Sequence, residues 1–198
     1  MKSLLKEKFL LYRIRAKKDS EAFGEIYDMY VRQIHRFIYF KVRSTEQAED
    51  LTSEAFLKAW QYLKEKDTVS HLQALLYSVA RSVVIDHYRK NAAQHEVPLE
   101  TEDGIERPEV ANETVLAEIE VKIDAAFVIE KLHGLKEEYR DVIVMRYLDG
   151  LSTGEIAEAI GKSSSNARVL LHRATKALTD IINHDTKRTE EHLAKHRQ

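Results

Sequence analysis

Residues 151–178 contain the stretch LSTGEIAEAIGKSSSNARVLLHRATKAL, and its spacing predicts two helices joined by a tight turn. Ser152 and Glu155 have the spacing of a capping box, which predicts that a short helix begins there. Gly161 predicts the end of that helix, because a residue in the left-handed conformation is favoured at this position. The short helix, the three-residue turn with its glycine and the longer helix that follows are typical of a helix-turn-helix.

The longer helix carries a local excess of positive charge. From Gly161 to Leu178 the chain has four basic residues and no acidic one, although the whole chain has 31 basic and 33 acidic residues and a net charge of −2. The serines and amides at the start of this helix are suited to hold a phosphate, and Arg168 has the reach to contact a base edge in the major groove. The pattern favours DNA binding; an ordinary helical hairpin with a solvated basic face is the alternative.

The rest of the C-terminal part is also predicted to be helical. Helices are expected over about 114–132 and 136–148, and Gly150 ends the second of them. One face of that helix is expected to carry Tyr139, Val142, Ile143 and Leu148. Ser163 or Ser164 caps the last helix, whose expected buried residues are Ala167, Leu170, Leu171, Ala174 and Leu178.

Apolar residues recur at three- and four-residue steps in the N-terminal part, which predicts three helices there. The first is capped by Asp19 or Ser20, and its apolar stripe is Phe23, Ile26, Tyr27, Tyr30, Ile34, Phe37 and Ile38. The second follows Ser44, which has capping-box spacing with Gln47, and its stripe is Ala48, Leu51, Ala55, Phe56, Ala59, Trp60 and Leu63. The third covers about 72–88, with inward residues Leu72, Leu75, Leu76, Val79, Val83 and Val84.

A proline-containing acidic stretch separates these two parts. Pro98 and Pro108 lie there with Gly104, and residues 93–120 carry nine acidic residues and one basic residue, a net charge of −8. Its first part has no apolar period, so a flexible acidic linker is expected over 93–113. The predicted fold is therefore all-α, with two small helical domains over 1–92 and 114–183, and a charged tail over 184–198.

The composition excludes several classes of function. The chain has no cysteine, so it has no disulfide, thiolate metal site or cysteine nucleophile. It also lacks a phosphate-cradling glycine loop and a paired His-Glu metalloprotease motif, so we expect neither an enzyme nor a cofactor. His192 and His196 are four residues apart without an evident third ligand, which leaves metal binding as a weak hypothesis. Because there is no long apolar run and no signal peptide, we expect a cytoplasmic chain that is not inserted in a membrane.

Two further surfaces are candidates for binding. The end of the third helix places basic residues near aromatic ones, a combination that suits a nucleic-acid strand with unpaired bases. Its residues are Arg81, Arg89 and Lys90 with Tyr77, His87 and Tyr88. A helix end stabilised by its dipole, with core tyrosines, is the plainer interpretation. The second helix has an acidic side, which is either solvated or docks a protein, formed by Glu46, Glu49, Asp50 and Glu54.

Four segments in this order resemble a bacterial RNA polymerase sigma factor of the extracytoplasmic-function group. DSEAFGEIYDMYVRQIHRFIYFKV (19–42) resembles the opening of the family's region 2, and AEDLTSEAFLKAW (48–60) is similar to its polymerase-docking helix. LLYSVARSVVIDHYRK (75–90) is similar to its minus-10 reading helix. Residues 135–174 resemble region 4, which reads the minus-35 element. The resemblance thus implies a region 2 bundle and a region 4 helix-turn-helix.

The resemblance also implies roles for individual residues. Contacts with the polymerase clamp helices fall to Asp50, Ser53 and Glu54. Contacts with the minus-10 promoter strand fall to Lys58, Tyr77, Arg81, Ser82, Arg89 and Lys90. Contacts with the minus-35 element fall to Ser164, Ser165, Asn166, Arg168, His172, Arg173 and Lys176, the last of these on phosphate. The implied partners are core RNA polymerase, promoter DNA and an anti-sigma factor. The resemblance also implies that the apolar surface of region 4 binds the polymerase flap. The acidic linker would extend toward the catalytic cleft of the polymerase.

The sequence departs from the family pattern at several positions that bear on base recognition. Ser82 stands where many members carry asparagine, Leu75 replaces a frequent tryptophan, and Ser53 replaces a frequent glutamine. In the last helix, SSSNARVLL replaces the usual glycine-threonine-valine run, and Leu170 sits where arginine is common. The sequence therefore does not predict which promoter bases are read.

The predicted function is that of a dissociable subunit that gives core RNA polymerase its promoter specificity, and directs DNA melting and initiation. It has two rivals. A self-sufficient helix-turn-helix regulator would bind a two-fold operator tightly without polymerase. A helical metal- or ligand-binding protein would hold stoichiometric metal through its histidines.

Overall fold

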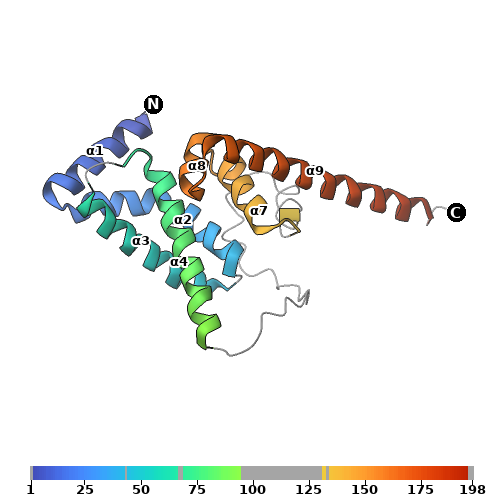
Figure 1. Ribbon diagram of the computed structural model, residues 1–198, viewed down its shortest axis with the longest axis horizontal. Helices are drawn as coiled ribbons and strands as arrows, with labels where there is room; N and C mark the ends of the chain where they lie inside the picture. The colour runs from blue at the N-terminus through green and yellow to red at the C-terminus, as the bar shows by residue number, and fades with distance from the viewer. Residues whose placement is uncertain (1, 43, 67–68, 95–130, 133, 196–198) are drawn as a thin grey trace. The chain divides into compact units, whose positions relative to one another are not determined.

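The computed structural model describes residues 2–42, 44–66, 69–94, 131–132 and 134–195, and most of these residues are helical. No strand occurs within these ranges, in agreement with the predicted all-α class. Contacts divide the chain into two compact units, with α1 to α4 in the first and α7, η1 and α9 in the second (Figure 1). The limits predicted for the domains, the linker and the tail stay predictions.

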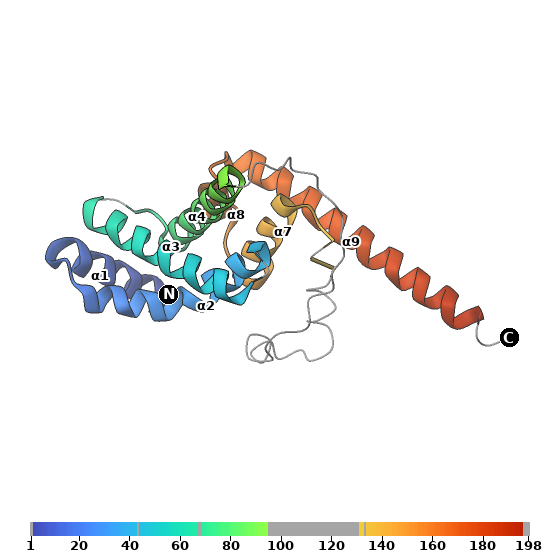
Figure 2. The same cartoon turned by 90° about the horizontal axis from the view of Figure 1, so that it is seen from below.

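The first unit is a bundle of four helices. They are α1 (Lys2–Lys17), α2 (Ser20–Val42), α3 (Thr45–Glu65) and α4 (Leu72–Gln94). α2 packs against the other three helices, and α3 also packs against α1 and α4 (Figure 2). The bundle brings α3 and α4, which carry the predicted docking and minus-10 residues, side by side.

Polar side chains begin α2 and α3 as predicted. The Asp19 carboxylate accepts hydrogen bonds from the backbone N–H of Glu21 at 3.0 Å and of Ala22 at 3.1 Å. The Ser44 hydroxyl accepts a hydrogen bond from the backbone N–H of Gln47 at 3.4 Å. Each oxygen satisfies an N–H group that has no partner within its helix.

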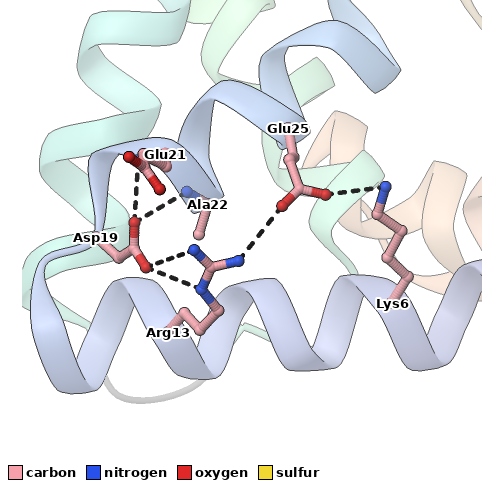
Figure 3. A network of polar contacts seen from close by, with 6 residues as sticks. All are labelled: Lys6, Arg13, Asp19, Glu21, Ala22 and Glu25. Atoms are coloured by element: carbon pink, nitrogen blue, oxygen red, sulfur yellow. Dashed lines mark hydrogen bonds and ion pairs between the residues drawn. The ribbon is translucent and has the colours of Figure 1, made fainter.

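A network of ion pairs joins α1 to α2 around the same cap (Figure 3). The Arg13 guanidinium lies 2.8 Å from the Asp19 carboxylate and 3.3 Å from that of Glu25, which also pairs with Lys6 at 3.0 Å. The hydrogen bond from the Ala22 backbone, together with Arg13, lowers the pKa of Asp19 below its ordinary value. The charged carboxylate is therefore the form that stabilises the fold.

Asp19→Asn is expected to destabilise the first unit at neutral pH and to have little effect in acid. Asparagine also caps a helix, so the variant removes mainly the charge. Because folding lowers the pKa of Asp19, its contribution is fully present above the unfolded value of about 3.9 and is lost as the pH falls through the folded value. Urea unfolding of the wild type and the variant at pH 7 and at pH 3 measures this. An equal difference in the free energy of unfolding at the two pH values would contradict a stabilising role for the charged carboxylate.

The predicted apolar stripes supply most of the core of the first unit. Ile26, Ile34, Phe37 and Leu63 are among its fully buried residues, as predicted. Tyr27 is an exception, because its side chain is 39% exposed at the rim, where its ring meets Phe56 edge-on with centroids 4.7 Å apart. The core also includes residues that were not predicted to be buried: Leu10, Leu11, Ile14, Ala22, Phe40, Ala74 and Ala80.

The second unit contains α7 (Glu137–Ile143), the π-helical turn η1 (Val144–Leu148) and α9 (Ser164–Lys195). α7 packs against α9. The helix predicted over 136–148 therefore changes to π geometry halfway, where the backbone N–H of Asp149 reaches the Val144 carbonyl. The wider turn rotates the residues after Ile143, so Leu148 is 38% exposed rather than on the buried face.

The last helix is longer than the predicted domain. α9 continues through the expected charged tail to Lys195, because no glycine or proline interrupts it. Ala167 and Ala174 are buried as predicted, while Leu170, Leu171 and Leu178 are only half-buried. Residues 93 and 94, predicted to begin the linker, are the last residues of α4. The rest of the predicted linker, 95–113, and nearly all of the helix expected over 114–132 lie outside the described residues.

Candidate protein and nucleic-acid interfaces

A helix-turn-helix forms where the sequence predicts it. α8 (Thr153–Ile160) begins with both halves of the capping box: the Glu155 N–H donates to the Ser152 hydroxyl at 3.2 Å, and the Ser152 N–H donates to the Glu155 carboxylate at 2.8 Å. The Arg146 guanidinium donates to the Leu151 carbonyl at 2.9 Å, which holds the chain just before this cap. Local hydrogen bonds therefore set where α8 begins.

The turn between α8 and α9 ends one helix and begins the next. Gly161 has φ +65°, its N–H donates to the Glu158 carbonyl, and the N–H of Lys162 donates to the Ala157 carbonyl. This pair of bonds is a Schellman motif, which needs a left-handed residue at the glycine position. The Ser163 hydroxyl then accepts a hydrogen bond from the Asn166 N–H at 3.3 Å, so Ser163 rather than Ser164 is the cap of α9.

Gly161→Ala is expected to destabilise the helix-turn-helix by about 1–2 kcal/mol, the cost of a left-handed backbone for a residue with a Cβ atom. No heavy atom lies within 4 Å of the added Cβ, so the effect comes from the backbone conformation and not from a clash. Gly154→Ala, in the first turn of α8, is the matched control and should not destabilise, because alanine favours a helix. Chemical denaturation of both variants tests this, and equal stabilities would contradict the strained-turn assignment.

The seven predicted minus-35 residues all lie exposed on the first half of α9: Ser164, Ser165, Asn166, Arg168, His172, Arg173 and Lys176. Since an α-helix has about 3.6 residues per turn, Ser165, Arg168, His172, Arg173 and Lys176 fall on one side of it, which we call the recognition face. The buried Ala167 and Ala174 lie on the opposite side. Within 161–179 no acidic residue offsets the cations of this face.

One exposed residue on this side of α9 was not among the predicted residues. Val169 is 49% exposed and lies one turn after Ser165 and one turn before Arg173. Hydrophobic periodicity does not single it out, because it is adjacent to Leu170 and Leu171 in an apolar run.

The predicted docking residues lie on the outer face of α3. Asp50 and Ser53 are exposed, and Glu54 is partly exposed. The Ser53 hydroxyl donates to the Glu49 carbonyl at 3.0 Å, so it is held against its own helix. Leu57, which the sequence analysis missed, is 62% exposed one turn after Ser53 and belongs to the same face. The face therefore combines carboxylates with an exposed apolar side chain.

A chain of charges connects this docking face to α4. The Lys58 ammonium lies 2.9 Å from the Glu54 carboxylate and 3.6 Å from that of Asp86, which in turn lies 3.6 Å from the Arg89 guanidinium. The hydrogen bond to Glu54, with help from Asp86, raises the pKa of Lys58 above its ordinary value. Asp86 was not among the predicted residues, although its three-residue spacing to Arg89 was a visible signal.

The predicted minus-10 residues on α4 do not share one environment. Ser82, Arg89 and Lys90 are exposed, and Arg81 is half-buried. Tyr77 is a correction: its side chain is fully buried, with its ring edge-on to Phe37 at a centroid distance of 5.0 Å. Because it fills the core between α2 and α4, Tyr77 has no free face on which a base could stack.

The end of α4 is anchored to α2 by an aromatic side chain. The Tyr88 hydroxyl donates to the Lys41 carbonyl at 2.7 Å, although the residue is 49% exposed. His87 meets the Tyr88 ring edge-on and lies within hydrogen-bonding distance of the Asn91 amide, 3.0 Å away. These contacts fix the direction of the helix that carries Arg89 and Lys90.

The described residues contain neither a cluster of metal ligands nor a membrane-spanning helix. Among the described residues, no three histidine, aspartate or glutamate side chains come together as a metal site. The hypothesis of a histidine pair involves His196, which lies outside those residues. None of the helices in the described part of the chain is long and apolar enough to cross a membrane.

Two family models match the chain in the order in which the two units occur. The model described as Sigma-70 region 2 matches residues 26–94, and that described as Sigma-70, region 4 matches residues 128–178. The first match covers most of α2, with α3 and α4, and the second covers the helix-turn-helix.

Curated relatives and solved structures agree with these matches. The ECF RNA polymerase sigma factor BldN of Streptomyces coelicolor is 30% identical over 173 residues, which are 85% of this chain and 63% of BldN. The ECF RNA polymerase sigma factor SigW of Bacillus subtilis is 30% identical over 167 residues, 82% of this chain and 89% of SigW.

Two solved structures have a TM-score of 0.64 at 20% identity, which indicates a shared fold. One is CnrH in complex with the cytosolic domain of CnrY, with 91% of this chain and 99% of the solved chain covered. The other is the sigma factor RpoE from Bartonella quintana in complex with the anti-sigma factor NepR, with 81% and 96% covered.

Proposed function

Because this chain belongs to the ECF family of RNA polymerase sigma factors, we propose that it binds core RNA polymerase and directs it to a two-element promoter. The strongest support is the order of the two family matches, with region 2 over residues 26–94 and region 4 after it over residues 128–178. Such a subunit works by binding, so the chain itself forms and breaks no covalent bond. It acts in the cytoplasm, where the polymerase is.

The outer face of α3 is the surface that docks on the polymerase. Asp50 and Glu54 supply negative charge there, and the exposed Leu57 supplies apolar area between them and the end of the helix. A charged surface of this kind steers a partner of opposite sign and orients it. The partner is a cationic helical surface of the core enzyme.

The exposed side of α4 meets the minus-10 strand. Arg89 and Lys90 follow the phosphate backbone, and Ser82 lies about two turns before them on the same helix. A base held out of the stack on this surface lowers the cost of opening the duplex, which is a binding effect and not catalysis. The Lys58 ammonium is paired with the Asp86 carboxylate, so Lys58 can contact DNA only when that ion pair is broken. A DNA phosphate therefore competes with Asp86 for Lys58.

The recognition face of α9 enters the major groove of the minus-35 element. Arg168 reaches a base edge, as arginine does in bidentate contacts with guanine. Lys176 and the amides at the start of α9 contact phosphates. The four cations of residues 161–178 neutralise few phosphates, so α9 by itself binds DNA with low affinity.

An anti-sigma factor is the proposed inhibitory partner. The sigma factor RpoE of the solved complex has the same fold and is bound there to the anti-sigma factor NepR. A partner that covers the α3 docking face and the recognition face together would block both polymerase and promoter binding.

Run-off transcription tests the proposed function directly. Core polymerase and genomic fragments from the organism that encodes the chain are incubated with and without it. Discrete transcripts that start only in its presence, downstream of two separated elements, are the expected result. If no start depends on the chain while it binds a two-fold operator alone, the proposal fails in favour of a self-sufficient regulator.

A further inference from the structure

Val169 is the apolar residue at the centre of the recognition face. It is 49% exposed, while the predicted minus-35 residues around it are polar or cationic. Along α9, Val169 lies four residues after Ser165, three before His172 and four before Arg173. Side chains three or four residues apart are neighbours on the surface of a helix, so Val169 is next to all three. Arg168 and Lys176 lie on the same side of the helix.

Folding of α9 does not account for a valine at this position. The buried side of the helix is formed by Ala167 and Ala174, with Leu170 and Leu171 half-buried. An exposed valine adds little packing and loses side-chain freedom in a helix. Single exposed apolar residues are common on protein surfaces, so the position of Val169 among the groups that face DNA is the informative observation.

The chemistry of the major groove limits what this side chain can recognise. Guanine, cytosine and adenine present hydrogen-bonding groups there, and thymine adds a C5-methyl group. An isopropyl group neither donates nor accepts hydrogen bonds, so it would strip water from a polar base edge without replacing the lost bonds. The thymine methyl group is the group of the major groove with which apolar side chains make contact.

We propose that Val169 reads the C5-methyl group of a thymine in the upstream promoter element. The inference rests on the proposed function, because it requires the recognition face to lie in the major groove. It goes further by assigning a base and an atom to one residue. It also explains how a helix with few cations selects sequence: apolar contact adds discrimination without adding phosphate contacts.

Replacing thymidine by deoxyuridine in the DNA tests this methyl contact directly. Deoxyuridine lacks only the methyl group, so base pairing and the other groove groups are retained. Each thymine of the upstream element, on either strand, is replaced in turn, and the affinity of the reconstituted holoenzyme is measured. One replacement should weaken binding by the wild-type holoenzyme by about 4-fold, the effect of losing one buried methyl-sized contact.

Variants at exposed positions separate the methyl contact from general DNA binding. Val169→Ala should bind the thymine template less tightly and should no longer distinguish it from deoxyuridine at that position. Lys176→Ala, the matched control, should bind both templates less tightly and keep the wild-type ratio, because a phosphate contact carries no base information. Circular dichroism of each variant verifies that α9 remains helical.

The outcomes distinguish this inference from the proposed function. If the wild type tolerates deoxyuridine everywhere, if Val169→Ala keeps the full penalty, or if the upstream element contains only G·C pairs, the methyl contact is wrong while promoter recognition stands. If the holoenzyme ignores the upstream element altogether, the proposed function of α9 fails, and this inference fails with it.

Discussion

Reversing the charges of Asp50 and Glu54 together, by Asp50→Lys and Glu54→Lys, is expected to weaken binding to core polymerase by about 30-fold or more. The estimate corresponds to about 2 kcal/mol, the lower end of the cost of disrupting a hydrogen-bonded charge pair in an interface. Fluorescence anisotropy of the labelled chain with core enzyme, in the absence of DNA, measures it. Folding should persist, because the ion pair between Glu54 and Lys58 is about 40% exposed and such pairs contribute about 1 kcal/mol or less.

The matched control changes the net charge equally at exposed positions off α3. Asp28→Lys with Asp180→Lys adds the same four units of charge on α2 and α9. This variant should bind core polymerase as the wild type does. An unchanged affinity after reversal at α3, or an equal loss in the control, would place the docking face elsewhere.

Arg168→Ala is expected to lower the affinity of the holoenzyme for a two-element promoter by about 5- to 150-fold, the range for losing one base contact of about 1–3 kcal/mol. Binding to core polymerase should not change, because the proposed docking face is on α3. The loss should disappear on a template whose upstream element has been scrambled. Quantitative run-off transcription on the two templates, beside polymerase-binding measurements, separates these effects.

Lys176→Ala is the contrasting variant for Arg168. A phosphate contact should weaken binding on both templates alike and reduce the dependence of affinity on salt concentration. If Arg168→Ala behaves in the same way, or weakens polymerase binding as much as initiation, then Arg168 does not read a base.

Local signals in the sequence predicted the helix-turn-helix almost completely. Ser152, Glu155, Gly161 and Ser163 take part in caps and a turn whose hydrogen bonds join residues three to five positions apart, so their roles are visible in spacing alone. The seven residues predicted to contact the minus-35 element are exposed for a related reason, since helical periodicity separates them from Ala167 and Ala174. Capping also predicted where α2 and α3 begin.

Features that depend on packing between helices were not predictable in the same way. Tyr77 has the composition of a stacking residue, and only its contact with Phe37 of α2 shows that it belongs to the core. Asp86 becomes part of a charge chain because α3 brings Lys58 beside it. The π turn in η1 rotates Leu148 outward although the apolar spacing suits a regular helix. In each case the deciding partner lies on another element, or the backbone departs from the period that the sequence suggests.

We expect the two units to recognise a promoter only when core polymerase holds them. With a net charge of −2 and four cations over residues 161–178, the chain alone releases few counterions from DNA. The direct test measures the affinity for a promoter and for a scrambled duplex with the chain alone, core alone and both together. For the chain alone, we expect the affinity for the promoter to be about equal to the affinity for the scrambled duplex. For the chain together with core polymerase, we expect the promoter to be bound about 10³-fold more tightly or more, as by specific DNA-binding proteins. Equal discrimination by the chain without polymerase would contradict it.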